Sequence, residues 1–422
     1  VEGKEEEEEE DDDDDEEDEY QNFDLLMLDS RQPLPDITEH PGEGQPPLPA
    51  PKPQHVGFSL WRKLNKYIGR DITHVVLPAT LNEPLSGLQR LVEELEYYQL
   101  LREALKQPSS ALRLAYVAAF ALSPYNSCLR TRKPFTPLVG ETFEFVSEEE
   151  PNIRFVAEQV THRKAAWFAE GDGGRWSSYG DLEMRSKFWG KRVEINFAGE
   201  CHLELPSTGD HFVWNKATCW VHNIIIGNLW AEWHGEVTVT NITSGEVAVV
   251  RMPKCNRMPG RRGYIMGQVC RADGEVEYNL QGNYLDSISA TPAKNSRPGN
   301  SPEPGLVLYQ RLPGLPDAEE QYNFTAFTLR VKNATEAEIR KLPPTDSRHR
   351  PDEKALEQGQ WELASAEKLR LATSQARRQK VASQRVQPVW FQWQQGDNTW
   401  RYGGDYWQQR EAGNWAKSRR IF

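Results

Sequence analysis

The chain has 422 residues, of which 38% are hydrophobic and 27% are charged, and its formal net charge is −13. The negative charge belongs to the first 19 residues, which hold 16 acids and one base, so the remaining chain carries 49 bases against 47 acids. Because that remainder is nearly neutral and the acidic tail would repel phosphate backbones, nucleic acid is not expected as a partner.

Other features of the sequence exclude further classes of site. The five cysteines are far apart and form no CxxC pair, which argues against a zinc module or a disulfide framework. No apolar run reaches the roughly 18 residues of a transmembrane helix, and the acidic start does not resemble a signal peptide. The motifs GxSxG, HExxH, GxxxxGK[ST] and GxGxxG are absent and the nine histidines lie singly, so no enzyme activity, metal or cofactor is expected.

Residues 1–54 are predicted to be a disordered tail, because like charges repel and little apolar surface is available for burial. Within it, the patch EYQNFDLLML (19–28) is apolar and aromatic beside the acidic run. Such a patch could be a docking motif for a partner, or it could be part of a solvated spacer.

The next segment is predicted to be helical. Leu60, Trp61, Leu64 and Ile68 recur at helical spacings, and Gly69 ends that pattern. Residues 86–108 have the pattern of one long amphipathic helix, and 110–125 that of a nearly apolar, buried helix. We therefore expect helices over most of 84–125.

From residue 141 the apolar period changes to two, and about ten short alternating runs between 141 and 284 predict one antiparallel sheet of many strands. Such a sheet tends to curl and close, because closure removes exposed edges. The predicted fold is mainly β with flanking helices: a large, near-closed antiparallel barrel over 141–332, with its interior either filled by side chains or holding a ligand.

The last third of the chain is predicted to add a strand over 322–333, a helix over 352–384 and an aromatic segment over 388–410 that caps the fold. Residues 333–422 thus form a C-terminal helical and aromatic extension. The many Trp, Tyr and Phe residues, together with a few cations at strand or loop ends, favour an apolar ligand that has a small polar head.

Segments in one order along the chain resemble the ligand-binding domain of the oxysterol-binding protein family. They are FSLWRKLNKYIG (58–69), NEPLSGLQRLVEELEYYQLL (82–101), YVAAF (116–120), RTRKPFTPLVGETFE (130–144), AEQVTH (157–162), SKFWGK (186–191), CWVHNIIIGNLW (219–230), YNFTAFTL (322–329), LPPTDSRHRPD (342–352), AEKLRL (366–371) and WRYGGDYW (400–407). Within the family, LQRLVEELEYYQLL (88–101) most resembles the oxysterol-binding protein itself and its nearest paralogue.

The resemblance implies that 55–422 is a lipid-binding domain with a barrel of about nineteen strands and a lid region over 57–80. Proteins of this family carry a sterol, such as cholesterol or an oxysterol, or another lipid in the tunnel, and many exchange it for phosphatidylinositol 4-phosphate between membranes. The lid would contain Trp61, Leu64 and Ile68. An alternative for these three residues is simple packing on the rim of the barrel.

The resemblance also implies a head-group site for the phosphoinositide. Lys133, His162 and Lys368 match family residues, whereas Thr136 stands in place of the usual Asn. Arg163 replaces a second histidine. Arg163 could bind phosphate through two parallel hydrogen bonds, or Arg163 and Lys164 could form an exposed basic turn at a membrane surface.

Two further departures from the family lie on the predicted late helix. This chain has Ala372 where the family usually has Glu, and Ala376 where the family usually has Arg. The site could therefore still bind an anionic head group with altered geometry, or it could have lost that ligand. The corresponding functions are a sterol transfer protein that exchanges lipids, and a sterol-dependent scaffold that does not. A carbohydrate-binding barrel rich in Trp is a third possibility.

Several family members dock on the endoplasmic reticulum through an acid-flanked motif that VAP proteins recognise. Here Glu19, Tyr20, Phe23 and Asp24 resemble that motif with altered spacing. The resemblance implies a cytoplasmic protein at the periphery of endoplasmic reticulum, Golgi or plasma membrane contacts. A pleckstrin-homology domain before Val1 is neither indicated nor excluded by the sequence.

Overall fold

The computed structural model of the chain describes most residues that follow the acidic and proline-rich tail. The described residues are 49–53, 67–73, 75–147, 152–224, 228–255, 260, 262–293, 305–316, 318–381, 385–396 and 398–422. The predicted docking residues Glu19, Tyr20, Phe23 and Asp24 and the predicted lid residues Trp61 and Leu64 lie outside this part of the chain. Ile68, the third predicted lid residue, lies within it.

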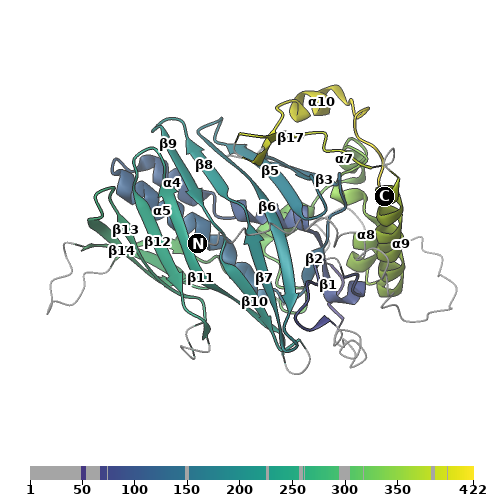
Figure 1. Ribbon diagram of the computed structural model, residues 1–422, viewed down its shortest axis with the longest axis horizontal. Coiled ribbons are helices and arrows are strands. Elements are labelled where there is room, and N and C mark those ends of the chain that lie inside the picture. Colours follow the sequence, from purple (N-terminus) through teal and green to yellow (C-terminus); the bar gives the residue numbers. More distant parts are fainter. Residues whose placement is uncertain are drawn as a thin grey trace, which may run out of the picture.

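A sheet of fourteen strands dominates the molecule (Figure 1). Its strands are β3 (Thr142–Val146), β4 (Arg154–Gln159), β5 (Lys164–Gly171), β6 (Trp176–Phe188), β7 (Arg192–Ala198), β8 (Cys201–Leu205), β9 (Asp210–Trp214), β10 (Thr218–His222), β11 (Trp230–Asn241), β12 (Val247–Met252), β13 (Tyr264–Cys270), β14 (Val276–Asn283), β15 (Ser287–Pro292) and β16 (Leu306–Gln310). Each pair of hydrogen-bonded neighbours in this sheet runs antiparallel.

The sheet follows the chain order except where two strands lie beside the main path. That path runs from β16 through β11, β10, β7 and β6 to β3, while β8 and β9 bridge β6 and β11. Among the described residues β3 and β16 do not pair with each other, so the curved sheet stays open along that line. The prediction of a large antiparallel sheet with flanking helices is confirmed.

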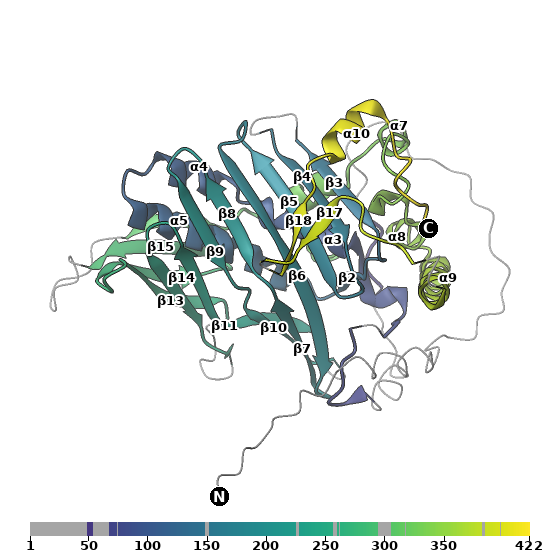
Figure 2. The same ribbon diagram turned by 45° about the horizontal axis from the view of Figure 1, so that its top comes forward.

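The hollow of the curved sheet is occupied by α5 (Ser110–Leu122), as Figures 1 and 2 show. Ten residues of this helix are buried. It contacts strands β9, β11, β12, β13, β14 and β16, which lie on different sides of it. A helix that is apolar on most sides is expected inside a fold rather than on its surface, and here it forms the centre of the main hydrophobic core.

The segment 86–108 is not the single helix that its periodicity predicts. It contains α3 (Gly87–Val92), a 3-10 turn (Glu93–Leu95) and α4 (Gln99–Lys106). The break lies at Tyr97, whose buried ring packs against Tyr309 with centroids 4.8 Å apart. Its hydroxyl also accepts a hydrogen bond from the Leu312 backbone. These tertiary contacts of Tyr97 lie at the point where the predicted helix is interrupted, although the helical spacing of apolar residues continues beyond it.

The strand predicted over 322–333 is wrong, because this segment contains the helix α6 (Ala326–Lys332). Thr325 and Thr328 form a capping box at its start. Phe327 and Val331 lie four residues apart and are both buried, as expected for one face of a helix. β-branched and aromatic residues made the segment resemble a strand.

The predicted helix over 352–384 is divided into α8 (Pro351–Glu357) and α9 (Trp361–Lys380). Gly359 lies between them with φ +76°, a conformation that suits glycine and ends a helix. Shorter helices precede them: α7 (Glu336–Ile339) and two 3-10 turns, Ala79–Leu81 and Ser347–His349.

The aromatic C-terminal segment packs on the outer face of the sheet. Strands β17 (Phe391–Gln394) and β18 (Thr399–Tyr402) form a hairpin that lies across β5 and β6 (Figure 2), and α10 (Tyr406–Ala412) follows. Trp390, Phe391 and Tyr406 are buried there against residues of β4 and β5. No helix within the described ranges is long and apolar enough to cross a membrane.

Candidate functional site

One of two short parallel strands outside the main sheet carries Lys133, the first predicted head-group residue. β1 (Asn82–Ser86) pairs with β2 (Lys133–Phe135), so Asn82 lies beside Lys133. The fully buried Asn82 donates from Nδ2 to the carbonyl oxygens of Lys133 (3.1 Å) and Pro134 (2.9 Å). Its Oδ1 accepts a hydrogen bond of 2.6 Å from Lys368 Nζ. Asn82 therefore joins β2 to α9.

Lys133 and Lys368 are thus brought together, as the resemblance implies. Lys368 Nζ also donates to the Leu77 carbonyl at 2.6 Å. Burial, reinforced by the charge of Lys133, holds the pKa of Lys368 well below its usual value. Burial likewise lowers the pKa of Lys133 to about 8, although the Asp71 carboxylate acts in the opposite direction. Within the described ranges neither lysine has a carboxylate within ion-pair distance, so an anion would be stabilised between them.

A buried arginine holds the backbone that follows Lys133. Arg350 donates from Nη1 to the Thr136 carbonyl (3.1 Å) and to Glu141 Oε2 (2.7 Å), and from Nη2 to Asp352 (2.7 Å). Glu141 also accepts hydrogen bonds from the Ser86 and Ser347 hydroxyls. The segment from Lys133 to Glu141 is therefore fixed by charge-assisted hydrogen bonds, which are the strong ones in proteins.

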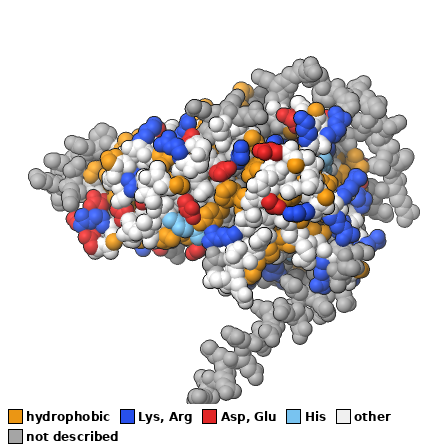
Figure 3. All heavy atoms as spheres, turned by 90° about the horizontal axis from the view of Figure 1, so that it is seen from above, with side chains coloured by type: hydrophobic (Ala, Val, Ile, Leu, Met, Phe, Trp, Pro, Cys, Tyr) orange, Lys and Arg blue, Asp and Glu red, His pale blue; other side chains and the backbone are white. Residues whose placement is uncertain are grey.

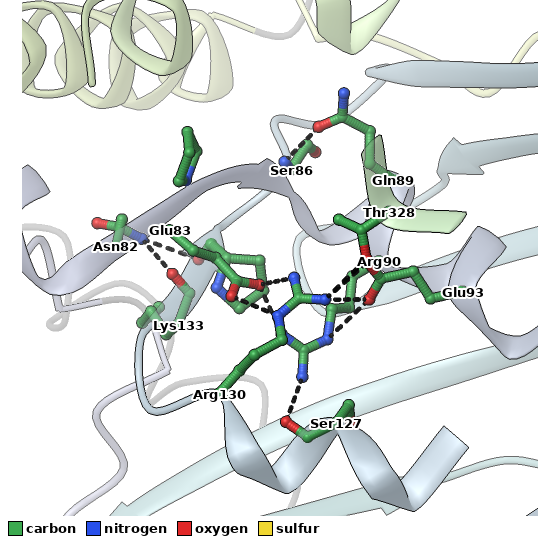
Figure 4. A network of polar contacts seen from close by, with 12 residues as sticks. Asn82, Glu83, Ser86, Gln89, Arg90, Glu93, Ser127, Arg130, Lys133 and Thr328 are labelled. Carbon is green, nitrogen blue, oxygen red and sulfur yellow. Dashed lines mark hydrogen bonds and ion pairs between the residues drawn. The ribbon is translucent and has the colours of Figure 1, made fainter. Parts of the chain in front are cut away.

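A second buried network lies on the other side of β1 (Figure 4). Arg130 donates to both oxygens of Glu83 at 2.9 and 2.7 Å and to both oxygens of Glu93 at 2.6 and 2.7 Å. Arg90 adds a contact to Glu83, and Thr328 of α6 donates to Glu93 at 2.6 Å. Burial would raise the pKa of Glu83, but the charges of Arg130 and Arg90 outweigh it and lower that pKa.

This network was missed by the sequence analysis. Arg90 and Glu93 are three residues apart, a spacing that is typical of an exposed ion pair on a helix. Nothing in the spacing of Glu83 and Arg130 indicates that they meet. The network fixes the first residues of β1, and so it fixes Asn82 next to the two lysines.

His162 and Arg163 lie in the turn between β4 and β5. The Thr161 hydroxyl accepts hydrogen bonds from the backbone N–H groups of Arg163 (3.3 Å) and Lys164 (3.0 Å). Gln159 Nε2 donates to the Thr161 carbonyl at 2.9 Å. Side-chain hydrogen bonds of this kind shape a tight turn without proline.

The two cations of this turn point to different surroundings. Lys164 Nζ lies 3.4 Å from Asp181 and 5.7 Å from the centre of the Trp393 ring, so it faces the C-terminal hairpin on the outer surface. The half-buried Arg163 guanidinium forms no hydrogen bond or ion pair with the described residues. Arg163 therefore keeps its donors available for a ligand, whereas Lys164 does not.

The turn and the lysine pair are linked through the backbone of residues 139 and 140. Gly140 N donates to the Gln159 carbonyl (2.8 Å), and Val139 N donates to Gln375 Oε1 of α9 (2.8 Å). No hydrogen bond or ion pair within the described part of the chain joins His162 or Arg163 to Lys133 or Lys368. Ala372 and Ala376, on α9 beyond Lys368, contribute only methyl groups.

Ile68 is 46% exposed, and the segment around it lies against the turn between β6 and β7. Gly69 N donates to the Phe188 carbonyl at 2.6 Å. At one end of the sheet interior, Phe120, Phe155, Trp167 and Trp214 surround a cavity of only about 10 Å³. That part of the interior is filled by side chains.

The described residues contain no cluster of three or more His, Cys, Asp and Glu side chains that could hold a metal ion. The five cysteines are free thiols. Lys133 and Lys368, whose pKa values are lowered by burial, and the half-buried Arg163 offer cationic hydrogen-bond donors, which suit a phosphate group.

Comparison with known proteins identifies similar sequences. The family model described as oxysterol-binding protein matches residues 59–411. The chain is 36% identical over 397 residues to oxysterol-binding protein-related protein 3 of Mus musculus, covering 92% of this chain and 45% of that protein. It is 35% identical over 382 residues to oxysterol-binding protein-related protein 1C of Arabidopsis thaliana, covering 89% and 46%. The chain therefore spans less than half the length of these two relatives.

Solved structures are similar in fold as well. The Osh1 ORD domain in complex with cholesterol matches with a TM-score of 0.79 and 30% identity, over 90% of this chain and 95% of that one. The Osh3 ORD of Saccharomyces cerevisiae in complex with PI(4)P matches with a TM-score of 0.76 and 30% identity, over 89% and 98%. Both matches extend over nearly the whole of the described fold.

Proposed function

Because the chain belongs to the oxysterol-binding protein family, we propose that it is a lipid-transfer protein that binds a sterol and exchanges it for phosphatidylinositol 4-phosphate between membranes. Similar domains have been solved with cholesterol, with ergosterol and with PI(4)P. The proposed lipid is held by the curved sheet and by the lid that includes Trp61, Leu64 and Ile68. The protein acts by binding, and no catalytic residue is proposed.

The observation that carries the phosphoinositide part of this proposal is the pairing of Lys133 with Lys368. Burial lowers the pKa of both lysines, and repulsion by the charge of Lys133 lowers the pKa of Lys368 further. A phosphate group placed between them relieves that repulsion. The folded protein thus holds charge ready for an anionic head group.

Arg163 is proposed to complete the head-group site together with Thr136 and His162. A histidine at the position of Arg163 would donate one hydrogen bond and would carry charge only when protonated. The guanidinium is charged at every physiological pH and donates in a planar fork that matches phosphate. The Arg163 guanidinium has no hydrogen-bond or ion-pair partner within the described ranges, which supports this role.

A second function, sterol-dependent scaffolding without exchange, is favoured by α9. Ala372 and Ala376 supply no polar group to a head group beside Lys368. A site with fewer donors would bind the phosphoinositide weakly while leaving sterol binding intact. The protein would then report sterol at a membrane without transporting it.

The remaining proposals concern partners and location. We propose that Glu19, Tyr20, Phe23 and Asp24 dock on VAP proteins of the endoplasmic reticulum, and that the chain works in the cytoplasm at contacts with Golgi or plasma membranes. Residues 57–80 would contact the membrane surface when the lid opens. Binding of the tail peptide to a VAP domain, with Tyr20→Ala as the control, tests the first of these proposals.

Extraction from liposomes tests the lipid ligands. Liposomes that contain labelled cholesterol or labelled phosphatidylinositol 4-phosphate are incubated with the native chain, with Lys133→Ala/Lys368→Ala and with Arg163→Ser. The native chain is expected to extract both lipids, the double variant only sterol, and Arg163→Ser less phosphoinositide. Lys164→Ser is the matched control, because Lys164 is engaged by Asp181.

One result would contradict exchange, and another would contradict the proposed head-group site. If the native chain extracts sterol alone, the scaffold function is favoured. If the native chain extracts both lipids and Lys133→Ala/Lys368→Ala extracts the phosphoinositide equally well, the head group binds elsewhere.

A further inference from the structure

A separate cavity of about 250 Å³ lies between the outer face of the sheet and the C-terminal segment. Its walls include Glu158 of β4, the segment from Arg385 to Trp390, and residues Lys417, Ser418 and Arg419. None of the five predicted head-group residues lines it. The volume is below the roughly 300–1,000 Å³ of pockets that hold drug-sized ligands. Its ligand would be a small group, not a whole lipid.

Two buried polar groups in this wall lack hydrogen-bond partners among the described residues. They are the Ser418 hydroxyl, on a residue that is 9% exposed, and the Trp390 indole N–H, on a residue that is 1% exposed. Buried polar groups are almost always paired, and an unpaired one costs stability. Because an indole nitrogen can only donate, its missing partner must be an acceptor.

The rim of the cavity is positively charged. Arg385 is exposed and donates to the Gln379 carbonyl at 3.0 Å, Lys417 lies 2.8 Å from Asp405, and Arg419 follows Ser418. Figure 3 shows Lys and Arg side chains gathered on the right-hand side, where α9 and the C-terminal segment lie. The pKa of Arg378 on α9 is lowered by burial and then by the charges of Arg419 and Arg370. Positive charge is therefore concentrated at this end.

Glu158 is the acidic group in the wall, and its oxygens are already engaged. They accept hydrogen bonds from the backbone N–H groups of Val389 (2.8 Å) and Trp390 (2.9 Å). Its role is thus to hold the segment that forms one side of the cavity. Burial raises the pKa of Glu158 to about 7, so near neutral pH its negative charge is partly lost.

We propose that this cavity is a second anion site, which binds a phosphate group through the Ser418 hydroxyl, the Trp390 indole and the Arg385 guanidinium. A tetrahedral oxyanion supplies the acceptors that the two buried donors lack, and the cationic rim favours its charge. The phosphate group could be free or could belong to a lipid head group. The site is independent of the pair Lys133 and Lys368, and so it does not depend on the proposed exchange function.

The test uses the full chain with two probes. Inorganic phosphate is titrated by calorimetry, and phosphatidylcholine vesicles with and without phosphatidylinositol 4-phosphate are tested by sedimentation. Arg385→Ser removes the rim charge from an exposed position, and Ser418→Ala removes the buried hydroxyl. Arg377→Ser, an exposed residue of α9 that does not line the cavity, is the matched control.

The native chain and Arg377→Ser are expected to bind phosphate equally, and Arg385→Ser roughly tenfold more weakly, the scale of one charge-assisted contact. Ser418→Ala should also bind more weakly without a lower unfolding midpoint, because the Ser418 hydroxyl has no hydrogen-bond partner to lose among the described residues. Lys133→Ala/Lys368→Ala, which removes the proposed head-group site, should retain the phosphate binding that Arg385→Ser weakens. If vesicles with phosphatidylinositol 4-phosphate bind and inorganic phosphate does not, and if the variants change vesicle binding in the same way, the phosphate group belongs to a lipid head group.

Two outcomes overturn the proposal. One is that neither probe binds. The other is that binding is unchanged by Arg385→Ser and Ser418→Ala but is lost in Lys133→Ala/Lys368→Ala, which would place all of it at the head-group site. If the chain does not exchange lipids but still binds phosphate at this cavity, the proposed exchange function is wrong and the second anion site is still supported.

Discussion

Arg130 shows how much the candidate site depends on a residue that would not bind the ligand. Its side chain is 3% exposed and lies between the carboxylates of Glu83 and Glu93. Removing one partner from a buried ion pair leaves an uncompensated charge, which costs far more than the pair itself contributes.

Arg130→Met is therefore expected to lower the free energy of unfolding by about 3–5 kcal/mol, measured by urea denaturation. The control is Arg251→Met, whose ion pair with Glu236 joins two exposed side chains on β12 and β11. Exposed pairs contribute little, so this control should unfold almost like the native chain. Equal losses in the two variants would contradict the account of the buried network.

Lys133 gives a prediction that depends on pH. Its pKa is about 8 in the folded protein against 10.5 for an ordinary lysine, so between these values the unfolded chain binds more protons. Stability must then rise with pH across this window. In Lys133→Met that contribution is absent.

The native chain should therefore gain stability relative to Lys133→Met as the pH rises from about 8 to about 10. Urea denaturation of both proteins, without lipid, at several pH values measures this difference. A difference that is constant with pH would show that Lys133 is not desolvated in the folded state.

At the residue scale the sequence indicated part of the candidate site, and its role in binding a head group stays a prediction. Lys133 and Lys368 were identified from their motifs and do meet around Asn82. Glu83 and Arg130 were not, because their partnership joins residues 47 positions apart and leaves no local pattern. The cavity at Ser418 was missed for the same reason, since it needs β4 and the C-terminal segment to lie side by side.

At the scale of elements, Gly282 shows where a strand tolerates no side chain. It lies in β14 with φ +144°, and an added Cβ would lie 2.1 Å from the Ser287 carbonyl oxygen of β15. Gly274, in the turn before β14, has φ +87° and nothing within 4 Å of an added Cβ.

Gly282→Ala is thus expected to destabilise the fold by roughly 2 kcal/mol or more, from backbone strain and overlap together. Gly274→Ala carries only the conformational cost of about 1–2 kcal/mol. Thermal unfolding of the two variants compares them directly. A larger loss in Gly274→Ala would show that the close approach of β14 and β15 does not limit this position.

The element boundaries that sequence patterns missed share one cause. In 86–108 the helical period continues through Tyr97, but the helix is interrupted where that ring is buried. In 322–333 the composition favours a strand, but the capping box at Thr325 and the burial of Phe327 and Val331 produce α6. Local patterns therefore predicted the sheet strands better than the helices that pack against them.

At the scale of the whole molecule, alternation in short runs predicted the large antiparallel sheet, and a sheet of this many twisted strands tends to curl. The sequence did not indicate that α5 fills one part of the hollow, because a buried helix carries no signal of the strands that surround it. The net charge was similarly uninformative: the body is nearly neutral, yet cations gather at its C-terminal end.

Sterol transfer between liposomes tests the central claim most directly. Donor liposomes carry fluorescent sterol, and acceptor liposomes either contain or lack phosphatidylinositol 4-phosphate. The native chain should deliver sterol faster to acceptors that contain the phosphoinositide, while the phosphoinositide moves to the donors. Lys133→Ala/Lys368→Ala should show only the slower rate. Exchange would be contradicted if the rate of sterol transfer were the same with and without phosphatidylinositol 4-phosphate and if no phosphatidylinositol 4-phosphate left the acceptor liposomes.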